Sequence, residues 1–341
     1  MRIGVLTGGG DCPGLNAAIR GVVKKSLQLG WSVVGIHDGW AGLVQGHVEP
    51  LTEFSIAGIL ARGGTILGTS RTNPFKKEGD VERCQDNMRR FGIDALVAIG
   101  GEDTLGVANK FFKLGWKVVG VPKTIDNDLS GTDYTFGFDT AVFIATDAID
   151  RCKTTAEAHR RVMVVEVMGR HAGWIATFSG LAGGADAILI PEQPFDIEQL
   201  CQVVQRRQKR GKLFSLIVVA EGAHPKEGTL HLQDEKLDSF GHVRLGGIGN
   251  LVGAEVEKRT GIETRVTILG HIQRGGAPTP TDRIRATRLA VAAVELAAEG
   301  KWGHMTGIHG NDIGSVPLAE AVATIKTVTP QFFKVAEVFF G

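Results

Sequence analysis

Charged side chains follow two short apolar runs in the middle of the chain, at residues 95–99 and 118–121. Each run ends in glycine or proline, and the charges that come next are Glu102, Asp103, Lys123, Asp126 and Asp128. Burying such groups for stability alone costs several kcal/mol per ion unless something compensates the charge. A divalent metal ion and a phosphate chain would compensate it. The residue types therefore predict a metal–phosphate site.

The two apolar runs indicate how these charges are brought together. Apolar runs of this length, bounded by turn residues, are typical of buried parallel strands. In open α/β sheets the ligand lies beyond the carboxyl ends of the strands. Two neighbouring strands would then gather the five charged residues in one small volume. The pattern predicts an α/β fold.

Length and composition exclude several classes of protein. A chain of 341 residues predicts about two domains, and a net charge of +1 predicts no attraction to nucleic acid. No stretch is apolar and long enough to span a bilayer, and the first residues lack the apolar core of a signal peptide. The four scattered cysteines indicate reduced thiols rather than a zinc site. We therefore expect a cytoplasmic globular protein.

Two glycine-rich loops could bind anions. Residues 7–14 link an expected strand at 3–6 to a helix, and backbone N–H groups in such a loop form an anion site. The pattern is neither a dinucleotide fingerprint nor a P-loop, and a plain strand-to-helix turn is the alternative. The second loop, at 62–73, carries Arg71, which either contacts a phosphate or is simply solvated.

The second half repeats this organisation. Expected strands at 162–167, 187–191 and 216–220 are followed by polar residues, and a further strand begins near residue 263. Arg265, His271 and Arg274 would lie near one ligand-sized volume, where two arginines favour a phosphate monoester. A structural, hydrogen-bonded role is the alternative for His271. Expected helices cover residues 51–60, 80–91, 138–156 and 281–300, and an apolar helical tail at 331–340 would dock on the body or on a partner chain.

Six motifs, taken in order, resemble the phosphofructokinase family over nearly the whole chain. They are Gly-Gly-Gly-Asp-Cys-Pro-Gly-Leu-Asn at 8–16, Gly-Gly-Glu-Asp-Thr at 100–104, Pro-Lys-Thr-Ile-Asp-Asn-Asp at 122–128, Val-Met-Gly-Arg at 167–170, Ala-Glu-Gly at 220–222 and Leu-Gly-His-Ile-Gln-Arg-Gly-Gly at 269–276. The resemblance implies transfer of a phosphoryl group to the 1-hydroxyl of fructose 6-phosphate. It also implies two Rossmann-like three-layer domains with largely parallel sheets and the active site in the cleft between them.

The domain boundaries expected from this likeness are approximate. Residues 1–137 with about 274–305 would bind the donor and Mg²⁺. Residues 138–273 with part of the C-terminus would bind fructose 6-phosphate, and residues 306–341 would form a C-terminal helical tail. Residues 234–247 form an expected insertion relative to the shorter bacterial enzymes of the family, and the sequence assigns this insertion no role.

The resemblance assigns roles position by position. Asp126 would be the general base on the sugar hydroxyl, and Glu102 would hold Mg²⁺ directly or through water, with support from Asp128. The donor phosphates would meet Gly10, Arg71, Asp103 and Thr104. The sugar phosphate would contact Thr124, Ile125, Asp126, Met168, Gly169, Arg170, Glu221, His271 and Arg274. Arg161 and Arg265 would reach the 6-phosphate from a neighbouring subunit, which implies a homodimer or homotetramer.

Two positions bear on the identity of the donor. ATP-dependent members usually carry glycine at the positions of Asp103 and Lys123, whereas the pyrophosphate-dependent members resemble this chain. A carboxylate where the α-phosphate of ATP must lie would cost several kcal/mol. Lys123 would add a fixed cation beside the transferred group, so that it and Asp103 join Asp126 as the predicted catalytic residues. We expect a reversible pyrophosphate-dependent enzyme.

Other functions stay open at this point. Glu102 resembles a Gly-Gly-Glu subgroup that contains both pyrophosphate and ATP users, so ATP is the first alternative. A non-catalytic regulatory subunit that binds sugar phosphate would have lost Asp126 or Lys123, and both are present. Lipid and NAD kinases share the Gly-Gly-Asp type of turn but lack the motifs at 122–128 and 269–276.

Overall fold

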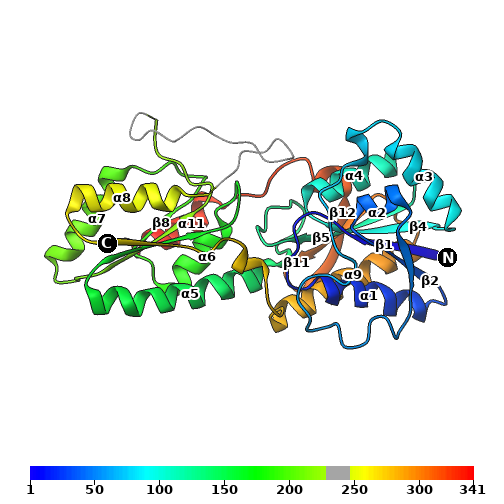
Figure 1. The fold of residues 1–341 in the computed structure, drawn as a ribbon, viewed down its shortest axis with the longest axis horizontal. Coiled ribbons are helices and arrows are strands. Elements are labelled where there is room, and N and C mark those ends of the chain that lie inside the picture. Colours follow the sequence, from blue (N-terminus) through cyan, green and yellow to red (C-terminus); the bar gives the residue numbers. More distant parts are fainter. Residues whose placement is uncertain (228–245) are drawn as a thin grey trace. The chain divides into compact units, whose positions relative to one another are not determined.

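The computed structural model describes residues 1–227 and 246–341. The chain folds into two compact units (Figure 1). The first consists of Met1–Ile125, Leu129–Thr140 and Arg274–Ile325, and the second of Asp126–Asp128, Ala141–Gln273 and Lys326–Gly341. Most of the expected insertion at 234–247 lies outside the described residues.

The first unit is built on a sheet of eight strands. They are β1 (Arg2–Thr7), β2 (Ser32–Ile36), β3 (Val48–Leu51), β4 (Ala95–Gly100), β5 (Val118–Thr124), β6 (Phe136–Gly137), β11 (His304–His309) and β12 (Asp312–Pro317). The order is β12-β11-β5-β4-β1-β2-β3, and β6 pairs with β5. Only the edge strands β3 and β12 run antiparallel to their neighbours among these pairs. In the register of β4 with β5, Gly100 lies opposite Pro122, so the charged segments that follow these two strands are neighbours.

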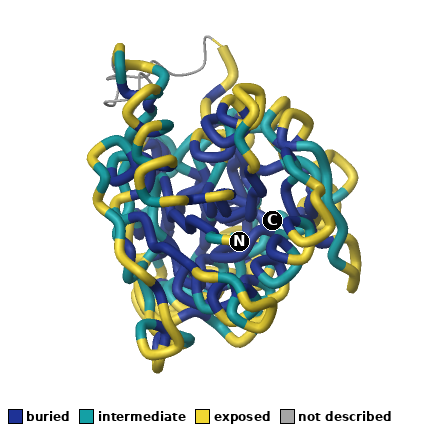
Figure 2. The backbone as a smooth tube through the Cα atoms, turned by 90° about the vertical axis from the view of Figure 1, so that its right-hand side faces the viewer, coloured by how far each residue is buried: buried dark blue, intermediate teal, exposed yellow. Residues whose placement is uncertain are grey.

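Helices cover both faces of this sheet (Figure 1). They are α1 (Leu15–Gln28), α2 (Trp40–Gln45), η1 (Pro74–Lys76), α3 (Asp80–Arg90), α4 (Glu102–Lys113), α9 (Pro280–Ala298) and α10 (Leu318–Ala321). Helices α1 and α9 lie on one face, where a Cβ on Gly21 would stand 3.0 Å from the Cβ of Ala290. The other face is packed by Trp40, Met88 and Phe111 from α2, α3 and α4. The sheet interior is accordingly buried, as the dark-blue tube in Figure 2 shows.

The second unit has a smaller, fully parallel sheet. Its strands are β7 (Val162–Val167), β8 (Ala187–Leu189), β9 (Ser215–Ala220) and β10 (Thr264–Ile268), in the order β10-β7-β9-β8. Its helices are α5 (Phe138–His159), which begins in the first unit, α6 (Trp174–Gly183), α7 (Ile197–Lys209), α8 (Ile248–Thr260), η2 (Gly270–Arg274) and α11 (Pro330–Glu337). Leu200 of α7 and Val252 of α8 pack with Ile217 on one face. The α/β class with mostly parallel sheets is thereby confirmed.

Three segments differ from the sequence prediction. The expected helix at 51–60 is instead the end of β3 followed by turns, because Pro50 and its charged neighbour suit an exposed edge strand. Residues 306–341 are not a purely helical tail, since β11 and β12 form a hairpin in the first sheet. Helix α9 is capped by Thr279 rather than by residue 281 or 282, with Pro280 in its first turn.

The apolar C-terminal helix docks on the chain's own second unit. The ring of Phe332 in α11 stacks on Phe178 of α6 at 5.2 Å between centroids. Within the described residues, no helix combines the length and the apolarity needed to cross a membrane.

Candidate active site

The glycine turn after β1 is closed around charged side chains of the first unit. Lys123, 3% exposed at the end of β5, donates a hydrogen bond from Nζ to the carbonyl of Gly10. A Cβ on Gly10 would lie 2.3 Å from Nη1 of Arg274, so glycine lets this guanidinium pack directly on the loop backbone. The Gly9 N–H donates to the Ser70 carbonyl at 3.0 Å, which brings in the loop that carries Arg71. Three predicted residues, Gly10, Lys123 and Arg71, therefore belong to one loop cluster.

Thr104 joins the turn after β4 to the same cluster. Its side chain fills the space beside Gly8 and Gly100, where an added Cβ would come within 2.6 and 2.3 Å of it. Glu102 and Asp103 occupy the first turn of α4 and are exposed. Carboxylates are favourable at a helix N-terminus because the dipole is positive there. The first unit thus presents two carboxylates and an ammonium beside a glycine cradle.

The segment after β5 carries the predicted base. Thr135 Oγ1 donates to the Thr124 carbonyl at 2.7 Å, and Ile125 is buried. Asp126 is 5% exposed, and Asn127 adopts a left-handed backbone conformation with φ of 54°. Asn127 Oδ1 accepts a hydrogen bond from Nζ of Lys326 at 3.1 Å. Sequence reasoning missed Lys326, because a contact across 199 residues leaves no local signal.

The polar segments after β7 and β9 form a second cluster, in the second unit. The Arg170 N–H donates to Glu221 Oε1 at 3.1 Å, and the Glu221 N–H donates to the Val167 carbonyl at 2.8 Å. A Cβ on Gly222 would lie 1.9 Å from the Arg170 carbonyl oxygen, so only glycine permits this approach. Met168 and Gly169 lie on the same turn, with Gly169 at φ of 142°. The structure thereby joins the Val-Met-Gly-Arg and Ala-Glu-Gly motifs.

Arg161 and Arg265 lie elsewhere on this unit. Both pair with Glu263, at 3.6 and 2.5 Å, where β7 and β10 begin. His271 follows the other end of β10, in η2. Arg265 and His271 therefore lie toward opposite ends of β10, and their expected contact with one ligand stays a prediction.

Arg274 lies with His271 in η2. It is the first residue of the first unit's last segment, and its guanidinium packs on Gly10. Its predicted contact with the sugar phosphate stays a prediction.

Buried titratable groups surround the base of the glycine loop. Burial raises the pKa of the Cys12 thiol to about 12, against the opposing effect of Lys123. Burial also raises the pKa of Asp282 to about 6, although Thr140 donates to its Oδ2 from both its N–H and its hydroxyl, at 2.8 and 2.6 Å. Asp282 fastens the start of α9 to the start of α5. Sequence reasoning missed this role, although Thr-Pro-x-Asp at a helix start is a recognisable capping signal.

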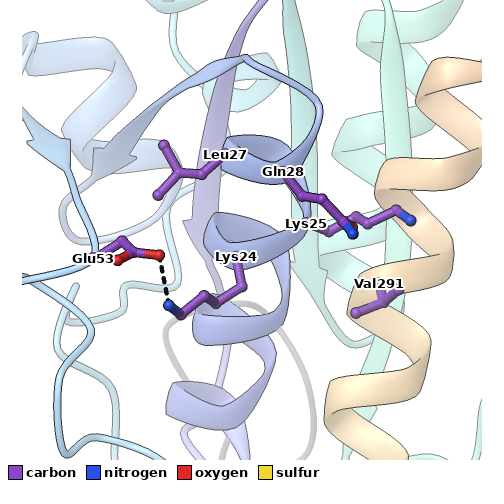
Figure 3. A pocket seen from close by; sticks show the side chains of 6 residues that line it. All are labelled: Lys24, Lys25, Leu27, Gln28, Glu53 and Val291. Atoms are coloured by element: carbon purple, nitrogen blue, oxygen red, sulfur yellow. Dashed lines mark hydrogen bonds and ion pairs between the residues drawn. The ribbon is translucent and has the colours of Figure 1, made fainter.

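A surface pocket in the first unit is separate from these clusters. It lies on α1 and α9, with Lys24, Lys25, Glu53 and Val291 around it (Figure 3). Lys24 pairs with Glu53 at 2.6 Å and Lys25 with Glu295 at 2.9 Å. Its ammonium groups are therefore already neutralised by carboxylates of the chain.

The described residues contain no group of three or more His, Cys, Asp or Glu side chains arranged to hold a metal ion. Magnesium bound through phosphate oxygens usually takes only one or two protein carboxylates. The exposed Glu102 on the first turn of α4 fits that requirement.

Comparisons with known proteins agree with the motifs. A family model described as phosphofructokinase matches residues 2–297. A Streptomyces coelicolor protein named pyrophosphate--fructose 6-phosphate 1-phosphotransferase is 57% identical, and the match covers 100% of both chains. A second protein of the same organism, named ATP-dependent 6-phosphofructokinase 2, is 54% identical, again over 100% of both chains.

A solved structure agrees in fold. The pyrophosphate-dependent phosphofructokinase from Marinobacter aquaeolei superposes with a TM-score of 0.81 at 25% identity, covering 97% of this chain and 86% of that one. The chain belongs to the phosphofructokinase family.

Proposed function

We propose that this chain transfers a phosphoryl group reversibly from pyrophosphate to the 1-hydroxyl of D-fructose 6-phosphate, yielding fructose 1,6-bisphosphate and phosphate. The observation that carries the proposal is the buried ammonium of Lys123, bonded to the Gly10 carbonyl inside the glycine cradle. A fixed cation in that place neutralises charge on a diphosphate. Pyrophosphate and phosphate also lie closer in energy than the ATP couple, which favours a reversible reaction.

Asp126 removes the proton of the 1-hydroxyl as the sugar oxygen attacks phosphorus. The P–O bond to the leaving phosphate breaks, and its electron pair stays on that phosphate. Catalysis of this kind depends on positioning and charge stabilisation rather than on covalent chemistry. Lys123 holds the developing negative charge, while Gly10, Arg71 and Thr104 hold the donor.

Glu102, supported by Asp128, would hold Mg²⁺. The bound ion would neutralise charge on the diphosphate oxygens. These two carboxylates supply the oxygen ligands that this cation prefers.

The sugar phosphate contacts the cluster of the second unit that contains Met168, Arg170 and Glu221. The hydrogen bond from the Arg170 N–H to Glu221 supports this role, because it holds the polar segments after β7 and β9 against each other. His271 and Arg274 complete the binding set.

Arg161 and Arg265 serve the site of a neighbouring copy in a homodimer or homotetramer. Their shared partner Glu263 lies at the strand ends opposite Met168 and Arg170, which supports action outside their own pocket. We propose a cytoplasmic location, in keeping with four cysteines that form no disulfide.

ATP is the second candidate donor, since a relative at 54% identity is named ATP-dependent. Asp103 argues against it, because a carboxylate facing the α-phosphate repels it. A coupled assay with saturating fructose 6-phosphate decides between the donors. Efficient turnover with pyrophosphate supports the proposal, and efficient turnover with ATP alone overturns it.

A further inference from the structure

We propose that Lys326, from the C-terminal segment, is a positioning residue that holds the loop at 126–128 in the geometry Asp126 needs for proton transfer. The inference rests on the proposed role of Asp126 as the base. It extends that proposal to a residue 199 positions from Asn127 in the sequence, and all the contacts involved lie within the second unit.

Lys326 contacts the loop through both its backbone and its side chain. Its N–H donates to the Asp128 carbonyl at 2.8 Å, and its Nζ donates to Asn127 Oδ1 at 3.1 Å. Asn127 is 1% exposed, so the ammonium replaces water as the partner of a buried amide. Removing a hydrogen-bond donor from such a buried group costs roughly 1–3 kcal/mol.

The conformation of Asn127 needs this support. A non-glycine residue at φ of 54° is in the left-handed region, which asparagine tolerates better than most residues but which still carries a cost. Asp126 precedes it directly, so a change in the Asn127 backbone redirects the carboxylate. Residues held in such conformations at functional sites depend on surrounding structure that over-determines them.

Lys326 is itself fixed by α6. Trp174 Nε1 donates to the Lys326 carbonyl at 2.9 Å, and the ammonium lies 5.6 Å from the centroid of the Trp174 ring. Two residues later, the Val328 N–H donates to Glu192 Oε1 at 2.8 Å. The same carboxylate accepts from the Gly173 N–H just before α6. The ammonium is therefore preorganised by a rigid helix start, as a supporting group should be.

The consequence for the reaction is specific. Misplacing a catalytic group by about 1 Å can lower the rate on the order of 100-fold while leaving substrate binding intact. If Lys326 only stabilised the fold, its loss would instead lower the free energy of unfolding and affect every kinetic constant similarly.

The test uses Lys326→Met, which keeps the aliphatic stem but removes the ammonium. We expect kcat to fall about 10- to 100-fold, with the KM values for fructose 6-phosphate and the donor within about threefold of wild type. Lys326→Arg, which can still donate to Asn127, restores most of the loss. Lys334→Met, at an exposed position on α11, is the matched control and leaves kcat unchanged.

A readout independent of the donor separates this inference from the proposed function. Amide hydrogen exchange of residues 126–128 accelerates in Lys326→Met but not in Lys334→Met. Unchanged exchange, or a kcat within threefold of wild type, overturns the positioning role. A wild-type protein inactive with every donor sinks the proposed function instead, and the exchange result still decides the inference about Lys326.

Discussion

The buried carboxylate of Asp282 should make the free energy of unfolding depend on pH by a calculable amount. Its pKa is raised from 3.8 to about 6, chiefly by desolvation, so the folded protein favours the neutral form more than the unfolded chain does. Because the pKa of this carboxyl is raised on folding, its contribution to the free energy of unfolding is fully present below the pKa of the unfolded chain. That contribution is lost as pH rises from about 4 to about 6. The difference between the two pKa values corresponds to about 3 kcal/mol of unfolding free energy.

Asp282→Asn removes this titration. Between pH 8 and pH 5 the wild type should gain about 1.4 kcal/mol of unfolding free energy relative to the variant. Other titrating groups contribute equally to both proteins and cancel in the difference. Thr140→Ala removes one donor to the carboxylate, so it should raise the pKa further and enlarge the effect.

Urea unfolding measured at several pH values gives this difference directly. Trp40 is buried in the first unit, and its fluorescence reports on the part of the molecule that contains Asp282. Wild-type and Asp282→Asn stability curves that run parallel from pH 5 to pH 8 would refute the argument. So would a wild type that loses stability relative to the variant on acidification.

Three further predictions concern the site. Asp126→Asn should lower kcat by about 10²–10⁴-fold with little change in fructose 6-phosphate affinity, measured by steady-state kinetics and calorimetry; unchanged turnover would remove Asp126 as the base. Gly222→Ala should raise KM for fructose 6-phosphate at least tenfold, because the new Cβ would clash with the Arg170 carbonyl. Gly106→Ala is the control, since this position in α4 has open space beside it. It should leave KM unchanged and add up to about 1 kcal/mol to the free energy of unfolding. Co-refolded Asp126→Asn and Arg265→Ala subunits should regain activity that neither has alone, and no regain would argue against shared sites.

The sequence predicted best where burial is continuous. Strands β4, β5, β7 and β9 are buried along nearly their whole length because parallel strands in these sheets are covered on both faces. The same pattern marks where each strand ends, so it also places the glycine and charged residues that follow at the ligand edge of the sheet. Helices α3, α5 and α9 were likewise expected close to their observed bounds.

The parts that sequence reasoning missed depend on edges and long-range contacts. Strand β3 contains Glu49 and Pro50 and has only one neighbour, so it has no apolar run to detect. The β11–β12 hairpin did carry a signal, the two-residue turn Gly310–Asn311 between strands. Lys326 carried none, because its role depends on a fold that brings the C-terminal segment back to residue 127.

Donor preference is the sharpest test of the proposed reaction. The specificity constants of wild type and the double variant Asp103→Gly/Lys123→Gly should be measured with pyrophosphate and with ATP. We expect the wild type to favour pyrophosphate by at least about 100-fold and the double variant to reduce that ratio by a similar factor, since relief of like-charge repulsion is worth several kcal/mol. A wild type that works efficiently with ATP but not with pyrophosphate, or a ratio unchanged by the double substitution, would contradict the account.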